Sequence, residues 1–197
     1  MMTRWAIGTA LLLTLLFCVP STPPDGTPPP ANDSLVNGGF TLPLTTGWHE
    51  TAQDFDGSHE IVLLPDSGVR ISKLFCGTAA IYQDVKLVDL NQQFATRCRF
   101  SATSNNPDYF SSAYLQLQFQ DGAARILGET RFGWSTNNSE LRSKPDLHVI
   151  PAVSDTWVDL SLNLADEVRA NLPAVAPDSI KRVRIQLRAF GSGRSAC

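Results

Sequence analysis

The sequence predicts an all-β fold, a two-sheet antiparallel β-sandwich of the jelly-roll type. Apolar and polar residues alternate strictly in three segments, which is the period of a strand that buries one face. These segments are 114–120, 157–164 and 183–188. Only Ala165–Leu172 has a helical pattern, and Pro173 limits its length. Many short strands with one apolar face are typical of a sandwich.

Shorter apolar and β-branched runs, separated by turn-forming residues, predict five further strands. They are Glu60–Leu64, Val69–Lys73, Ala79–Leu87, Ala95–Thr103 and Ala124–Glu129. Asp121-Gly122 lies between two strand patterns and predicts a hairpin turn. Leu115, Leu117 and Phe119 are expected to face the core, so the residues between them face the opposite side.

The N-terminal part of the chain does not continue this pattern. An uncharged, largely apolar run, Trp5–Val19, follows Arg4. The run is shorter than the about 20 residues of a membrane-spanning helix and fits a secretory signal. A lipid anchor on Cys18 and an uncleaved anchor are the alternatives. The predicted organisation is a signal peptide at 1–21, a proline-rich linker at 22–33 and a secreted, cell-surface or periplasmic sandwich domain at 34–197.

Composition and motifs argue against several classes of function. The formal net charge is -3, which does not fit a nucleic-acid binder. The sequence contains no G-x-S-x-G, H-E-x-x-H, Walker or C-x-x-C motif. We therefore expect no catalytic activity and no required cofactor. A hydrolase built on two carboxylates stays open as an alternative, because such a pair leaves no local signature.

Two features suggest structural reinforcement. Export makes a disulfide chemically reasonable, and Cys76–Cys98 is the preferred pair; the alternative is that the cysteines are small buried apolar residues. Asp54, Asp56 and Glu60 surround Gly57, and calcium favours several oxygen ligands on a loop that can curl. These three acids are the candidate ligands of a structural calcium ion, with a solvated loop as the alternative.

Four motifs carry a resemblance to a known family. They are Leu35-Val36-Asn37-Gly38-Gly39-Phe40 with Gly47-Trp48, Ala79–Val85, Thr156-Trp157-Val158 and Ile180–Ala189. The chain thereby resembles galactose-binding-like jelly rolls, of which carbohydrate-binding modules of families 4, 9 and 22 are members. The resemblance implies a first strand at the Asn-Gly-Gly-Phe motif and core positions for Trp48 and Trp157. Thr41 replaces an acidic residue of the family pattern. The family's closing strand would follow Cys197, so the sandwich is expected to lack it.

The expected ligand is a polysaccharide or oligosaccharide. Sugar hydroxyls need planar donors and acceptors, which the polar strand faces supply, and sugar rings pack on aromatic side chains. Aromatic residues in loop-like segments form a second candidate set, with Trp134 as the leading candidate. The loop candidates are Trp134, Tyr109, Phe132 and Arg131, and the strand-face candidates are Tyr114, Gln116, Gln118, Arg184, Gln186 and Arg188.

The sequence thus predicts a secreted, non-catalytic carbohydrate-binding module. A structural or adhesion domain of the cell surface is the main alternative, because the polar strand faces are equally typical of the wet side of a sandwich. A small glycan-active hydrolase is the second alternative. Contact with a membrane is expected only through the signal or a lipid anchor.

Overall fold

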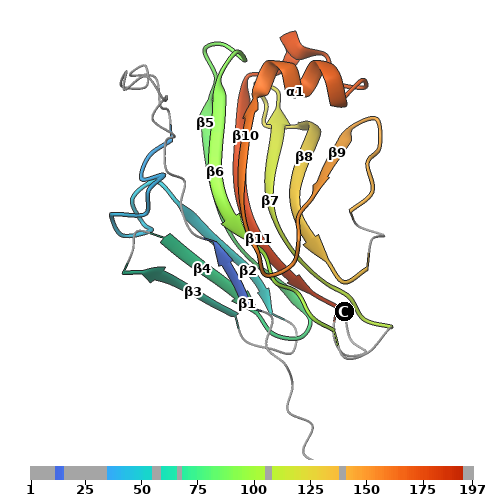
Figure 1. The fold of residues 1–197 in the computed structure, drawn as a ribbon. Coiled ribbons are helices and arrows are strands. Elements are labelled where there is room, and N and C mark those ends of the chain that lie inside the picture. Colours follow the sequence, from blue (N-terminus) through green and yellow to red (C-terminus); the bar gives the residue numbers. More distant parts are fainter. Residues whose placement is uncertain are drawn as a thin grey trace, which may run out of the picture.

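The computed structural model describes residues 12–15, 35–54, 59–65, 68–104, 108–137 and 141–192. It confirms the predicted all-β sandwich, built from one large sheet and two small ones (Figure 1). The strands are β1 (Leu12–Leu15), β2 (His49–Asp54), β3 (His59–Leu64), β4 (Gly68–Lys73), β5 (Gly77–Lys86), β6 (Gln93–Arg99), β7 (Ser111–Gln120), β8 (Ile126–Ser135), β9 (Leu147–Pro151), β10 (Trp157–Asn163) and β11 (Arg182–Gly191). The helices are α1 (Leu164–Asn171) and a 3-10 turn, η1 (Pro177–Ser179).

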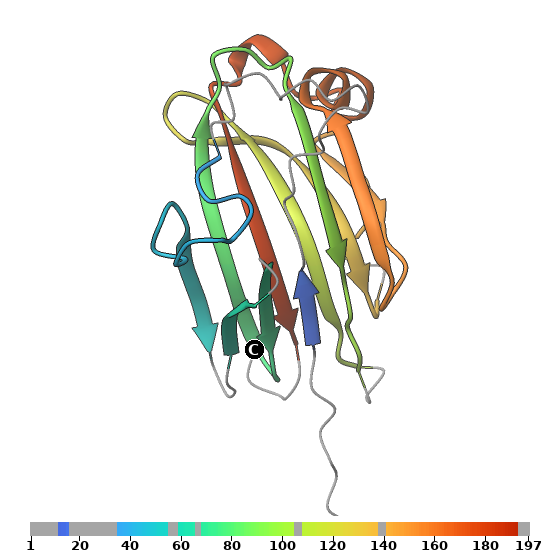
Figure 2. The ribbon, with the colours of Figure 1, turned by 60° about the vertical axis from the view of Figure 1, so that its left-hand side comes forward.

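The large sheet has six strands in the order β2-β5-β11-β7-β8-β9. Strand β11, the last strand in the sequence, lies between β5 and β7, and the three run side by side along the molecule (Figure 2). Every neighbouring pair is antiparallel except β8 and β9, which are parallel. The sandwich is therefore antiparallel as predicted apart from this one pair.

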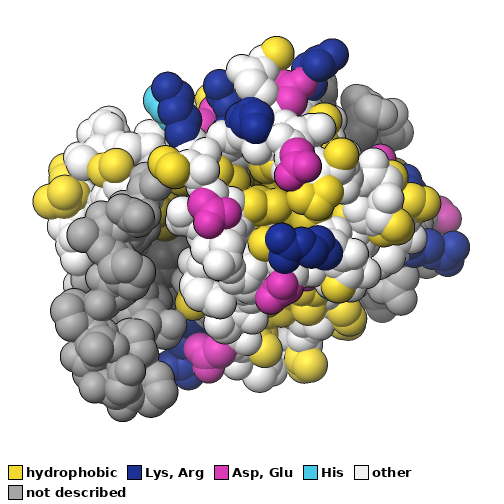
Figure 3. Space-filling model, turned by 90° about the horizontal axis from the view of Figure 1, so that it is seen from above, with side chains coloured by type: hydrophobic (Ala, Val, Ile, Leu, Met, Phe, Trp, Pro, Cys, Tyr) yellow, Lys and Arg dark blue, Asp and Glu magenta, His cyan; other side chains and the backbone are white. Residues whose placement is uncertain are grey.

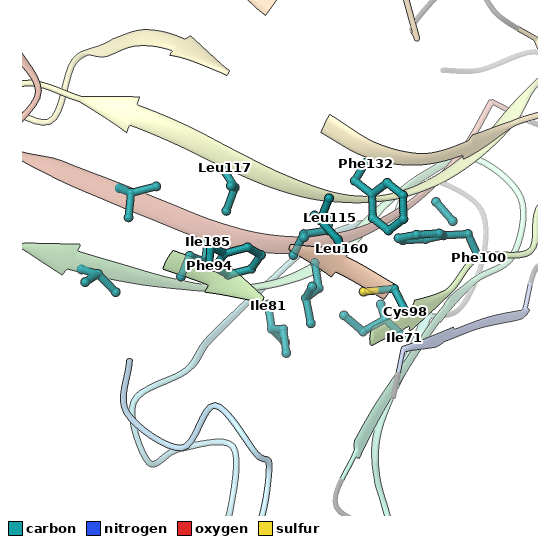
Figure 4. Close-up of a cluster of buried hydrophobic side chains, with 14 of the residues drawn as sticks. Ile71, Ile81, Phe94, Cys98, Phe100, Leu115, Leu117, Phe132, Leu160 and Ile185 are labelled. Carbon is teal, nitrogen blue, oxygen red and sulfur yellow. The ribbon is translucent and has the colours of Figure 1, made fainter. Parts of the chain in front are cut away.

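The second layer consists of the β6–β10 pair and the sheet β1-β4-β3. Apolar side chains of both layers meet in one core cluster, which includes Ile81 and Leu115 from the large sheet and Phe94 and Leu160 from the facing pair (Figure 4). The strict alternation in the sequence explains this arrangement, because each strand presents one apolar face to the other layer.

Helix α1 closes one end of the sandwich (Figure 1). The Asn163 side chain caps it by accepting hydrogen bonds from the backbone N–H groups of Ala165 and Asp166, at 3.0 and 3.2 Å. Such a cap satisfies donors that a helix start leaves open. The predicted helix at 165–172 is confirmed with a shift of one residue at each end.

A buried carboxylate attaches α1 to the large sheet. Glu167 is 7% exposed. Its Oε1 accepts a hydrogen bond from Thr130 Oγ1 at 2.7 Å and lies 2.5 Å from His148 Nδ1, while Oε2 accepts one from Asn171 Nδ2 at 2.8 Å. The carboxylate therefore connects β8, β9 and the helix at a single point.

The Asn-Gly-Gly-Phe motif forms a hydrogen-bonded loop, so the prediction of a first strand there is wrong. Asn37 and Phe40 have φ angles of 53° and 52°, which no strand accommodates. The Asn37 side chain donates a hydrogen bond to the Leu42 carbonyl and accepts one from the Leu42 N–H. The backbone carbonyl of Asn37 accepts a hydrogen bond from Trp48 Nε1 at 3.1 Å. Phe40 and Trp48 stack with centroids 5.1 Å apart. The motif is thus a structural loop that packs against the buried Trp48 side chain.

The same loop is attached to the large sheet by Gln83. Its side-chain amide donates to the Val36 carbonyl at 2.9 Å and accepts from the Val36 N–H at 2.7 Å. An amide that pairs in both directions replaces the two bonds of a neighbouring strand. This contact explains why a glutamine stands on the apolar side of β5.

Three further expectations need correction. β8 extends to Ser135, so Arg131, Phe132 and Trp134 lie in a strand and not in a loop. Trp157 is half-buried under Arg97, whose Cζ lies 5.7 Å from the ring centroid, and is not a core residue. Strands β2 and β9 were not predicted, because neither His49–Asp54 nor Leu147–Pro151 has a strict alternation.

The predicted Cys76–Cys98 disulfide is also wrong. Cys76 is disulfide-bonded, whereas Cys98 retains its thiol in the core. Cys98 points from β6 into the cluster of Figure 4, and its sulfur lies 3.6 Å from Thr96 Oγ1. Cys76 lies in the turn between β4 and β5.

The N-terminal predictions fall largely outside the described residues. Of the predicted signal and linker, only Leu12–Leu15 is described, and it pairs with β4 as strand β1. The expected missing closing strand concerns residues beyond Ser192, which are likewise not described. Within the described ranges, no helix has the length and apolar character needed to cross a bilayer.

Candidate functional site: the polar face of the large sheet

The side of the six-stranded sheet that faces away from the core carries a continuous array of polar and aromatic side chains. We call this array the polar face. Strand alternation places the even-numbered residues of β5, β7 and β11 there, and the register brings them into rows. Its main members are His49, Tyr82, Asp84, Ser112, Tyr114, Gln116, Gln118, Gln120, Glu129, Arg131, Arg182, Arg184, Gln186, Arg188 and Phe190.

Arginine side chains lie flat over the tyrosine rings of this face. Arg184 Cζ is 4.1 Å from the ring centroid of Tyr82. Arg131 and Arg188 lie over Tyr114 at 5.2 and 5.7 Å. Tyr114 is only 1% exposed. Cation–π contacts of this kind stabilise the arrangement of the arginine and tyrosine side chains.

Gly133 makes room for this arrangement. It stands opposite Tyr114 in the β7–β8 register. A Cβ at this position would lie 2.5 Å from Tyr114 Cβ and 2.3 Å from the Ala113 carbonyl oxygen. Only glycine therefore allows β8 to approach the tyrosine this closely.

Two of the arginines on this face are neutralised by carboxylates. Arg184 binds Asp84 through two hydrogen bonds of 2.7 and 2.8 Å, a forked geometry that suits a carboxylate. The hydrogen bond and the charge of Arg184 lower the pKa of Asp84 below its usual value. Arg131 pairs with Glu129 at 2.8 Å. The Asp84 carboxylate is therefore held in its charged form at neutral pH.

Several buried polar atoms of this face make no hydrogen bond with the protein. In the described part of the chain, seven buried side-chain nitrogen and oxygen atoms have no partner, and five of them lie here. They are Ser112 Oγ, Gln116 Oε1, Gln120 Oε1, Arg182 Nε and Arg188 Nε. All five belong to β7 and β11, two adjacent strands. Native proteins satisfy nearly all such atoms, so their clustering on two adjacent strands is unusual.

The strand-face candidates predicted from the sequence all lie on the polar face. Tyr114, Gln116 and Gln118 come from β7, and Arg184, Gln186 and Arg188 from β11. The register brings each β7 residue opposite a β11 residue. The facing pairs are Tyr114 with Arg188, Gln116 with Gln186 and Gln118 with Arg184.

The loop candidates are divided among three places. Arg131 lies on the polar face. Phe132 is 4% exposed and packs edge-to-face on Phe100 in the core. Trp134 has the same strand parity as Phe132 and packs partly against the core. Tyr109 precedes β7 and is half-buried, with its carbonyl accepting from Ser104 Oγ at 2.8 Å. Of this set, only Arg131 joins the array.

Other members of the polar face were not among the predicted ligand-binding residues. Ser112, Gln120, Arg182 and Phe190 extend the same alternation at the ends of β7 and β11. They could have been predicted by extending the same alternation over longer strands, because β7 and β11 are each 10 residues long. Phe190 also contacts Phe110, with ring centroids 5.2 Å apart. It gives this end of the face an aromatic surface.

The proposed calcium ligands do not form a described site. Glu60 lies on β3 and pairs with Arg70 at 3.0 Å. Asp56 and the side chain of Asp54 fall outside the described residues. Among the residues that are described, no group of three or more His, Cys, Asp and Glu side chains could hold a metal ion.

Comparisons with known proteins give little further information. No family model matches the chain, and no curated protein sequence does either. Among solved structures, the chain is similar to the enzymatically active domain of tailspike protein 4 of bacteriophage CBA120, at 10% identity and a TM-score of 0.42. The match covers 80% of this chain and 20% of that chain. A likeness of this degree carries no information on function.

Proposed function

We propose that this protein is a secreted, non-catalytic carbohydrate-binding module whose ligand lies on the polar face. The observation that carries the proposal is the cluster of five buried polar atoms without partners on β7 and β11. A buried acceptor such as Gln116 Oε1 costs about 1–3 kcal/mol when it makes no hydrogen bond. A ligand rich in hydroxyl groups, each both donor and acceptor, would satisfy such atoms along the whole face.

The aromatic side chains support the same ligand class. Tyr82 and Phe190 are half-buried members of this face. The C–H faces of a sugar ring pack on aromatic side chains, because the π face of an aromatic ring is negative and attracts polarised C–H groups. Aromatic and planar polar side chains therefore lie together on this face, which supports a saccharide as the ligand.

The carboxylates favour binding over hydrolysis. Asp84 and Glu129 occupy one row of the sheet, but their strands are three spacings apart, which corresponds to about 14 Å. Glycoside hydrolysis uses two carboxyl groups about 5–9.5 Å apart, one of them protonated. Here both are bound to arginines, and neither is arranged to donate a proton.

The surface charge does not favour a nucleic acid as the ligand. At the α1 end of the molecule, lysine and arginine side chains are interspersed with aspartate and glutamate (Figure 3). Nucleic-acid-binding domains usually carry a net positive charge, whereas the four arginines of the polar face are accompanied by two carboxylates. The net charge of -3 points the same way.

Gln116→Leu is expected to weaken saccharide binding without weakening the fold. Leucine keeps the volume of the buried side chain and removes the unpartnered oxygen, so the free energy of unfolding should stay equal or rise by about 1 kcal/mol. Loss of one ligand hydrogen bond worth about 1–2 kcal/mol should lower the affinity about fivefold to thirtyfold. Isothermal titration calorimetry on a panel of neutral and acidic oligosaccharides would measure the affinity, and urea unfolding the stability.

The matched control is Gln93→Leu, at an exposed glutamine of β6 on the other layer. This variant should bind like the wild type. Failure of the wild-type protein to bind any glycan of the panel, or equal binding by the Gln116→Leu variant, would refute the proposal.

A further inference from the structure

Two arginines of the polar face have no carboxylate partner. Arg184 and Arg131 form ion pairs, as described above. Among the described residues, no acidic side chain lies within ion-pair distance of Arg182 or Arg188. Arg188 donates only to Thr78 Oγ1 at 3.2 Å, and Arg182 donates to the Gly122 carbonyl at 3.4 Å. The Nε atoms of both are buried and have no partner.

The face therefore carries an excess of positive charge on a chain whose net charge is negative. Its four arginines face two carboxylates, Asp84 and Glu129. Arg182 and Arg188 each donate a hydrogen bond to the protein, and a carboxylate in a forked geometry would add a directly paired counter-charge and further acceptors.

The unpartnered atoms also indicate which hydrogen-bonding groups the ligand must have. Gln116 Oε1 is an acceptor and needs a donor. A phosphate or sulfate group offers acceptors only at neutral pH, so it could serve the arginines but not this oxygen. A sugar acid offers a carboxylate and hydroxyl donors on the same ring. It meets both demands on a single ring, and its carboxylate suits the forked geometry of a guanidinium.

The spacing of the two arginines indicates a chain of sugars. Arg182 and Arg188 lie six residues apart on β11, which corresponds to about 20 Å along the strand. A monosaccharide cannot reach both, whereas an extended oligosaccharide with repeated carboxylates can. We infer that the polar face binds a polyuronate chain and that Arg188 binds one of its carboxylates. This inference rests on the proposed function.

The test compares oligogalacturonate and oligomannuronate with their methyl esters, which keep the ring and remove the charge. At low ionic strength, at least one of the two free acids should bind tenfold or more tightly than its ester. Arg188→Gln should abolish this preference, because it removes the charge that distinguishes the free acid from its ester. Added salt should weaken binding of the acid more than that of the ester.

Arg97→Gln is the matched control, because Arg97 is an exposed arginine on the other layer, and this variant should keep the preference. The inference would be overturned if acid and ester bind equally, if Arg188→Gln keeps the preference, or if a sulfated neutral glycan competes better than the free acids. Binding of neutral glycans alone would overturn the inference and leave the proposed function standing. Absence of binding to every glycan would overturn both.

Discussion

Glu167→Ala is expected to destabilise the protein by about 3–5 kcal/mol. The substitution removes a buried carboxylate that accepts from Thr130 and Asn171 and contacts His148. Removing one member of a buried hydrogen-bond network leaves the other members without partners. The resulting loss of stability exceeds the net stabilisation that the intact network provides. Because this carboxylate connects β8, β9 and α1, the loss should loosen the helix before the rest of the sandwich.

Chemical unfolding and backbone hydrogen exchange would measure these two effects. Asp166→Ala is the control on the same helix, since Asp166 forms only an exposed ion pair with Arg169 at 3.5 Å. Its effect should remain within about 0.5 kcal/mol. A Glu167→Ala variant as stable as the Asp166→Ala variant would contradict the role assigned to this network.

Trp48→Ala is expected to cost about 3–5 kcal/mol, the range for removing a large buried aromatic side chain. Trp48 is 4% exposed, stacks on Phe40 and donates to the Asn37 carbonyl. Its loss empties the space under the Asn-Gly-Gly-Phe loop and leaves that carbonyl without its donor. Thermal and urea unfolding would measure the change.

Trp157→Ala gives a direct comparison, because both tryptophans were expected in the core and only Trp48 is buried there. Trp157 is half-buried and contacts Arg97, so its replacement should cost about 1–2 kcal/mol. Equal costs for the two substitutions would show that the assignment of the two side chains is incorrect.

The strands that could be predicted from the sequence are those with one polar and one apolar side. In β7 and β11, every second residue is apolar, and the period alone identifies both the strand and its core side. β2 and β9 lack this alternation. The Phe-Gly-Trp stretch of β8 resembled a loop because its glycine and small polar neighbours are common in turns, although Gly133 is required by the tertiary contact with Tyr114.

The polar face was predictable in its members but not in its organisation. Alternation indicated that Tyr114, Gln116 and Gln118 share one side. It could not show that β11 inserts between β5 and β7, a pairing of strands far apart in sequence. That insertion brings Arg184 to Asp84 and Arg188 to Tyr114. The hydrogen bonds of Glu167 could not be predicted from the sequence either, since a glutamate on a short helix ordinarily faces solvent.

The most direct test of the account is a nuclear magnetic resonance titration with the best-binding oligosaccharide of the panel. Saccharide binding on the polar face predicts that the largest shift changes occur at the Gln116 side-chain amide, the Arg188 Nε–H and the backbone of β7 and β11. The β6–β10 pair should remain unchanged. Shift changes centred on β6 and β10, with none at Gln116 or Arg188, would contradict the central claim.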